Sequence, residues 1–168
     1  RKENIAEYIL YPWQLEDLLR ALQFSPEAIY SQLVAPRNPD PARGHELLVW
    51  YLEIAALLRD EGKEQNGHLD HTLHLIRELD RLHDDLMALP AGEHYRALLA
   101  ELAPELPRLR GLASGSDTLD DSMSDVELML RTLYAAMLYR IRGGEKSGAA
   151  EDAVDLISPV IAQLAHIY

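Results

Sequence analysis

The sequence contains 0 cysteine residues and only 1 phenylalanine among its 168 residues. Without cysteine the chain can form no disulfide bond, no thiolate nucleophile and no zinc site with thiolate ligands. The scarcity of phenylalanine and of β-branched residues, beside abundant leucine and alanine, favours helices over a β-sheet. Apolar residues make up 48% of the chain, so we expect a folded domain with its own hydrophobic core.

Basic residues are also scarce. The chain has 16 Lys and Arg residues against 28 Asp and Glu residues, and its formal net charge is −12. Nucleic acids and anionic membranes bind clustered positive charge, so neither is an expected partner. No apolar run approaches the roughly 18 residues of a membrane span, and no signal peptide is visible. We therefore expect an acidic, cytoplasmic protein.

Complete catalytic motifs are missing as well. The sequence has no G-x-S-x-G, no P-loop and no G-x-G-x-x-G. It has no Glu-x-x-His pair of the kind that di-iron bundles use. The acidic run from Asp117 to Asp125 lacks the glycine and the closing glutamate of an EF-hand loop. We name no catalytic residue, metal or cofactor, and the balance favours a protein that is not an enzyme.

Hydrophobic periodicity near 3.6 residues predicts helices through most of the chain. They cover residues 4–22, 26–34, 45–60, 66 or 67 to 89, 94–113 (broken by Pro104 and Pro107), 124–142 and 149–165. A proline-rich loop over residues 35–44 and a polar, acidic loop over residues 114–123 separate some of them. The fold class is all-α, an antiparallel bundle of five to seven helices in a single domain over residues 1–168.

Three helices have distinctive features. Pro12 and Pro159 lie inside the first and last helices, where each removes a backbone hydrogen bond. Pro12 predicts a kink, and Pro159 predicts a kink or a split of the last helix. The helix over residues 45–60 is apolar around most of its circumference, which predicts that it is the most buried helix of the bundle.

The first helix concentrates charge next to aromatic surface. Glu16 falls among the apolar residues of its face, Arg20 lies one turn further on, and Trp13 is on the same edge. A carboxylate in apolar surroundings must be paired, hydrogen-bonded or protonated. Glu16 and Arg20 could form an ion pair that fixes how the helix docks, or they could line a small ligand pocket with Trp13. Both interpretations remain open.

Histidines are concentrated in the helix over residues 67–89. His83 falls in its apolar stripe, where a neutral core histidine is the common case. It could instead meet Glu16 and form a carboxylate–imidazole dyad suited to acid–base chemistry. The candidate ligand-binding set is therefore Trp13, Glu16, Arg20 and His83.

Two metal patterns are weaker. His71, His74 and Glu78 share one helix face at chelating spacing, but that face is charged and typical of a solvated surface. His83-Asp84, with His45 upstream and Asp120, Asp121 or Asp125 downstream, follows the residue order of HD-type metal phosphohydrolases. Neither pattern predicts a metal site.

The two ends of the chain, NIAEYILYPWQLEDLLRA and SDVELMLRTLYAAMLYRI with the terminal AQLAHIY, together resemble the domain-of-unknown-function 4924 family of Bacteroidetes proteins. The specific part is an IAEYxLYxWQxEDxxRA pattern in the first helix, matched here by Ile5, Ala6, Glu7, Tyr8, Leu10, Tyr11, Trp13, Gln14, Glu16, Asp17, Arg20 and Ala21. The resemblance implies an all-helical cytoplasmic protein and no particular activity.

Two hypotheses follow. The first is a non-enzymatic helical-bundle protein that acts through a protein interface, and the expected partner is a second copy of the chain in a homodimer. The second is a small-molecule-binding or metal-dependent hydrolytic protein with a polar pocket around the first helix. A close-packed Glu16–Arg20 ion pair together with a large apolar patch suited to a two-fold contact would favour the first hypothesis, and a pocket that exposes Glu16 and Arg20 would favour the second.

Overall fold

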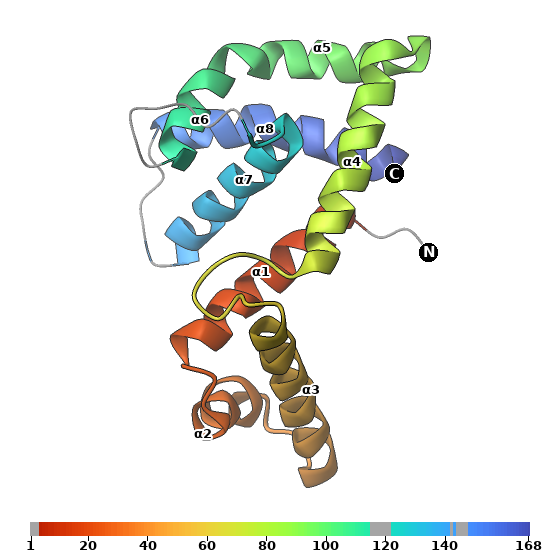
Figure 1. The fold of residues 1–168 in the computed structure, drawn as a ribbon. Coiled ribbons are helices and arrows are strands. Elements are labelled where there is room, and N and C mark those ends of the chain that lie inside the picture. The colour runs from red at the N-terminus through yellow and green to blue at the C-terminus, as the bar shows by residue number, and fades with distance from the viewer. Residues whose placement is uncertain (1–3, 115–121, 142, 144–147) are drawn as a thin grey trace. The chain divides into compact units, whose positions relative to one another are not determined.

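The computed structural model describes residues 4–114, 122–141, 143 and 148–168 (Figure 1). These residues form helices and, within the described ranges, no strand, so the all-α prediction is confirmed. The elements are α1 (Ile5–Ala21), α2 (Pro26–Ile29), α3 (Pro41–Asp60), α4 (Asp70–Ala88), α5 (Glu93–Leu102), α6 (Leu106–Ser114), α7 (Asp125–Ile141) and α8 (Gly148–Ile167). All of these except the single turn α2 have 9 or more residues. Most of the predicted acidic loop, residues 115–121, lies outside the described residues.

Two helix starts differ from the prediction. α3 begins at Pro41, inside the segment that we expected to be a loop through Gly44, because the Asp40 side chain accepts a hydrogen bond from the backbone N–H of Arg43 at 2.9 Å. An aspartate cap followed by proline starts a helix efficiently. α4 begins at Asp70 and not at Gly67, because Gly67 has a left-handed backbone with φ +93°.

Prolines shape the helices in different ways. α1 and α8 continue through Pro12 and Pro159 without interruption. The helical segment predicted over residues 94–113 is split by its prolines, as expected. Pro104 falls in the 3-10 turn Ala103–Glu105, and Pro107 falls in the first turn of α6. α2 continues into a π-helical turn, Tyr30–Val34, and then into a 3-10 turn, Ala35–Arg37.

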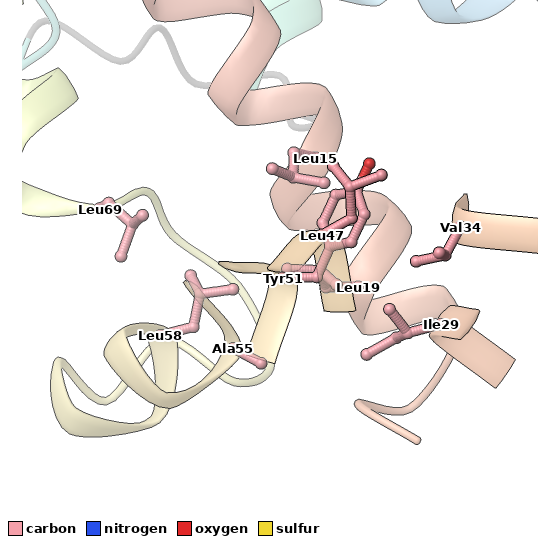
Figure 2. Packing of buried hydrophobic residues seen from close by; sticks show 9 residues of the cluster. All are labelled: Leu15, Leu19, Ile29, Val34, Leu47, Tyr51, Ala55, Leu58 and Leu69. Atoms are coloured by element: carbon pink, nitrogen blue, oxygen red, sulfur yellow. The ribbon is translucent and has the colours of Figure 1, made fainter. Parts of the chain in front are cut away.

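The chain forms two compact units. Unit 1 comprises Arg1–Leu10 and Leu75–Tyr168, and unit 2 comprises Tyr11–His74. In unit 2, α1, α2 and α3 surround one hydrophobic core, shown in Figure 2. The core residues are Leu15, Leu19, Ile29, Val34, Leu47, Tyr51, Ala55, Leu58 and Leu69.

α3 is buried on one side only. Tyr51, Ala55 and Leu58 are almost fully buried, but Trp50 retains 42% of its exposure and Leu57 retains 40%. The prediction that α3 is the most buried helix of the bundle is therefore wrong. The other helices of unit 2 cover one face of α3 and leave Trp50 and Leu57 on its other face exposed.

In unit 1, α8 packs against α5 and α7, and α6 packs against α7. α8 presents Ala153, Ile157, Val160 and Leu164 to the core at helical spacing. α7 contributes Val126, Leu128, Met129 and Leu130. No helix among the described residues is long and apolar enough to cross a membrane.

Candidate functional site

The Glu16 carboxylate is the centre of a polar cluster in unit 2. Glu16 is fully buried on α1, which confirms that it lies on the inner face of the helix. One carboxylate oxygen lies 2.9 Å from His68 Nδ1, and the other accepts a hydrogen bond from the backbone N–H of Leu69 at 3.2 Å. Both oxygens therefore have partners, as a buried carboxylate requires.

Trp13 lies against the same histidine. Its indole ring is fully buried and stacks on the His68 ring, with centroids 4.0 Å apart and planes 17° from parallel. The indole N–H donates to Thr72 Oγ1 at 3.2 Å, and the Thr72 hydroxyl donates to the Leu69 carbonyl at 2.8 Å. A tryptophan that stacks and also satisfies its N–H holds a single orientation.

Arg20 binds the loop between α3 and α4, residues 61–69. Its guanidinium donates to the Lys63 carbonyl at 3.0 and 3.3 Å and to the Gly67 carbonyl at 2.5 Å. It also pairs with Asp17 at 3.0 Å. The planar guanidinium suits two neighbouring acceptors. Arg20 therefore pairs with Asp17, and Glu16 pairs with His68, in place of the Glu16–Arg20 ion pair that we considered from the sequence.

Lys63 closes the loop onto the start of α4. Its ammonium donates to the His68 carbonyl and pairs with the Asp70 carboxylate at 2.8 Å. The backbone N–H of Asp70 in turn donates to Glu61 Oε1 at 2.8 Å. We use the term Glu16 cluster for the residues that join α1 to this loop and to the first turn of α4, namely Trp13, Glu16, Arg20, Lys63, His68, Leu69 and Thr72.

His83 belongs to unit 1 and has different partners. Its Nδ1 lies 2.6 Å from the Tyr95 hydroxyl, and the two rings meet edge to face with centroids 5.6 Å apart. Tyr95 is almost fully buried, and burial, with smaller effects from Asp125 and Asp80, raises the pKa of its phenol. Of the four candidate ligand-binding residues, the structure therefore places three in the Glu16 cluster and His83 in a separate polar group.

Asp80 adds a carboxylate to that group. Partial burial raises the pKa of Asp80, and the nearby Glu127 and Asp84 carboxylates raise it further. A hydrogen bond from the Ser124 hydroxyl and the charge of His83 act in the opposite direction. Ser124 also caps α7, because its Oγ accepts from the backbone N–H of Glu127 at 3.1 Å. We use the term His83 cluster for Asp80, His83, Tyr95 and Ser124.

The two metal patterns gain no support from the described residues. No group of three or more His, Asp or Glu side chains in the described ranges is placed to hold a metal ion. His71 and His74 are exposed on α4, and Glu78 accepts a hydrogen bond from the Tyr168 hydroxyl. Asp120 and Asp121, two alternatives in the HD-type order, lie outside the described residues.

Sequence reasoning missed His68, Thr72 and Lys63 as partners of α1. His68 lies 52 residues from Glu16, so no helical spacing relates them. A usable signal was present in the turn GKEQNGHLDHT, whose glycines end one helix and delay the next. A loop that crosses a buried carboxylate must offer it donors, and His68 was the nearest titratable residue before α4.

The arrangement limits the chemistry open to each residue. The Glu16 carboxylate has no exposed surface, so a dissolved substrate cannot reach it. The Arg20 side chain is only 13% exposed, and loop carbonyls and Asp17 occupy its guanidinium. His68 keeps 14% of its side-chain exposure, and no described group hydrogen-bonds its Nε2. His68 Nε2 is therefore the one reactive atom of the Glu16–His68 pair that faces solvent in the described structure.

Comparison with protein-family models gives a match over the whole chain. The family model described as "Domain of unknown function (DUF4924)" matches residues 1–168, the whole chain. No curated protein and no solved structure matches the chain. The family resemblance seen in the sequence is confirmed, and its description carries no activity to transfer.

Proposed function

The chain belongs to the DUF4924 family, and from this premise we propose that it acts by binding another protein and not by catalysing a reaction. One observation carries the proposal. The charged residues of the distinctive first-helix pattern, Glu16 and Arg20, have their polar atoms engaged in contacts inside unit 2. Side chains so engaged stabilise a fold and are poorly placed to bind a substrate.

The contacts of the Glu16 cluster act as a clamp between α1 and the 61–69 loop, and such a clamp would help a protein that binds a partner. It fixes the loop after α3 to α1 and so holds α3 in one position against the rest of unit 2. A rigid helix lowers the entropic cost of binding a partner. The exposed Trp50 and Leu57 of α3 are the kind of large side chains that supply most of the binding energy in interfaces. Self-association and a cytoplasmic location are further parts of the proposal, the latter supported by the absence of cysteine.

The direct test is affinity purification of the full chain from its own cells, with quantification of the proteins that accompany it. The Trp50→Ala/Leu57→Ala double variant should lose the stoichiometric partners. A matched control, Leu112→Ala, changes an exposed leucine (68% exposed) on α6 in unit 1 and should retain them. Circular dichroism must show that both variants keep their helices. Partners that survive the double variant, or no partner at all, would contradict the proposal.

A second candidate function rests on His68. Its Nδ1 bonds a buried carboxylate while its Nε2 faces solvent, which is the arrangement of an imidazole oriented for proton transfer or for ligand binding. Native mass spectrometry of tag-free protein tests it. A stoichiometric small-molecule or metal adduct that disappears in His68→Gln would support this candidate, whereas the bare mass of a monomer or dimer would favour the interaction protein.

A further inference from the structure

The exposed side of α3 carries an ordered seam. Six exposed residues follow one another at spacings of three and four, which places them along one line on the helix surface: Arg43, Glu46, Trp50, Glu53, Leu57 and Asp60. Spacings of this kind define the contact line of two packed helices. The opposite side of α3 packs on the core of unit 2, so the seam is the surface that remains for a partner.

Large apolar residues and acidic residues alternate along the central part of the seam. In coiled-coil terms, Trp50 and Leu57 occupy equivalent positions seven residues apart, and the alternate positions are all acidic: Glu46, Glu53 and Asp60. The Trp50 ring leans on Tyr51, with centroids 5.1 Å apart, so it is partly ordered already. The seam therefore offers two large apolar side chains separated by three carboxylates.

A second copy of the chain suits this seam poorly. Parallel pairing would bring each carboxylate against the same carboxylate of the other copy. Antiparallel pairing would bury the two central glutamates against Trp50 and Leu57, and within the seam itself the basic residue is Arg43. Arg43 already pairs with Glu46 at 3.3 Å. Carboxylates that lose water without gaining a cation oppose association.

From the proposed function we infer that the seam binds a basic amphipathic helix of another protein. Such a helix would present leucine-like residues to Trp50 and Leu57, and lysine or arginine to the acidic positions between them. Helix-in-groove recognition uses this spacing of apolar anchors. The net charge of −12 would also attract such a segment from a distance and raise its association rate.

The probe is a pair of fluorescein-labelled synthetic peptides of equal length, with leucine along one helical face. One peptide carries lysine and the other glutamate on the flanking positions. Fluorescence anisotropy with the full chain should detect binding of the lysine peptide only. Glu53→Lys and Trp50→Ala should each weaken it by about tenfold or more, since truncating or opposing a central anchor acts mainly on dissociation.

The matched control is Glu101→Lys, which reverses an exposed glutamate on α5 in unit 1 and changes the net charge equally. It should alter the affinity by less than about twofold, because separated surface charges are largely screened. Equal losses for Glu53→Lys and Glu101→Lys would show general attraction and overturn the inference. So would a failure of the lysine peptide to bind, or a chain dimer that Trp50→Ala abolishes.

The two proposals fail differently. If partners purified from cells depend on Trp50 but the lysine peptide does not bind, the protein is an interaction protein and the inference about a basic helix is wrong. If no cellular partner depends on Trp50 and the lysine peptide does not bind either, the proposed function fails as well.

Discussion

The Glu16 cluster and the His83 cluster both bring titratable side chains together, yet they differ in how those side chains are satisfied. In unit 2 a fully buried carboxylate has a partner on each oxygen. In unit 1 the half-buried Asp80 lies near two other carboxylates, which helps to raise its pKa. The first cluster joins a helix to a loop, whereas the second joins neighbouring helices through a tyrosine and a histidine.

The difference shows that a dense sequence motif need not be a reactive site. The IAEYxLYxWQxEDxxRA pattern packs two charges and an aromatic ring into one face of α1, and the structure uses all three to hold the 61–69 loop. The less conspicuous His83 cluster contains the carboxylate with the raised pKa. If this comparison is right, changes in the Glu16 cluster should chiefly affect stability, and changes in the His83 cluster should have smaller, pH-dependent effects.

The largest effect is expected for Glu16→Ala. The change leaves the His68 ring nitrogen and the Leu69 N–H without their acceptor in a buried place. Each buried polar group that loses its partner costs about 1–3 kcal/mol of unfolding free energy, and this change affects two such groups. Urea unfolding followed by circular dichroism measures the loss. Glu53→Ala, an exposed glutamate of the same unit, should change it by less than about 0.5 kcal/mol. Equal small losses for both variants would remove the distinction between the clusters.

Arg20→Ala should cause the second-largest loss of unfolding free energy. Two loop carbonyls, of Lys63 and Gly67, lose a charged donor, but water can reach them because the loop lies at the surface. We expect a loss of about 2 kcal/mol, typical of hydrogen bonds to a charged group. Arg20→Lys should recover only part of it, since an ammonium cannot reproduce the planar fork. Full recovery by lysine would mean that charge alone matters here.

Tyr95→Phe should cost about 1 kcal/mol at pH 8, since it removes one hydrogen bond to His83. Burial raises the pKa of Tyr95 above its ordinary value of 10.0. A pKa that is higher in the folded state gives stability that is present below the unfolded pKa and is lost as pH rises through the folded one. The advantage of the wild type over Tyr95→Phe should therefore shrink as pH rises beyond 10. Urea unfolding at pH 8 and pH 10.5 makes the comparison.

Asp80→Asn should change the unfolding free energy less than Tyr95→Phe does. The advantage of the wild type over the variant should again shrink as pH rises. The pKa of Asp80 is raised above 3.8 in the folded state, first by burial. The folded wild type is favoured when Asp80 is protonated, and it loses stability relative to the asparagine variant as pH rises through the folded pKa. The difference should stay below about 1 kcal/mol because solvent screens a half-buried group. Unfolding curves between pH 4 and pH 7 would reveal it, and a difference with the opposite pH trend would exclude a raised pKa.

His71→Ala and His74→Ala should have the smallest effect. Both side chains are exposed on α4, and exposed substitutions usually stay within about 0.5 kcal/mol. Differential scanning fluorimetry with and without added Zn²⁺ tests this. A large loss of stability, or a zinc-dependent shift that only the wild type shows, would mean that these histidines form a site after all.

Periodicity was sufficient to predict the helical elements but not how completely each helix is covered. It located the helices that became α1, α3, α4, α7 and α8 within a few residues. It could not show that Trp50 and Leu57 remain exposed. An apolar side chain contributes equally to the periodic pattern whether or not another helix packs on it. The early start of α3 was readable, since Asp40-Pro41 repeats the cap-and-proline signal of Ser25-Pro26.

For the candidate site, too, one part could be predicted from the sequence and another could not. The burial of Glu16 followed from its place on the helix face, and Trp13 and Arg20, which were named with it, contact the same loop and the first turn of α4. The identity of the partner did not follow. The path that brings His68 to Glu16 depends on left-handed backbone at Gly62 and Gly67, with φ +71° and +93°, and such loop geometry is not encoded in any periodic pattern.

Amide hydrogen exchange, read by mass spectrometry, tests the central claim that the first-helix motif is a clamp on the 61–69 loop. In the wild type the Leu69 N–H donates to Glu16 and should be protected. In Glu16→Ala, peptides covering residues 61–72 should exchange much faster, while peptides from α5, α7 and the described part of α8 keep wild-type rates. Unchanged exchange over residues 61–72 would contradict the clamp and return Glu16 to the list of residues available for chemistry.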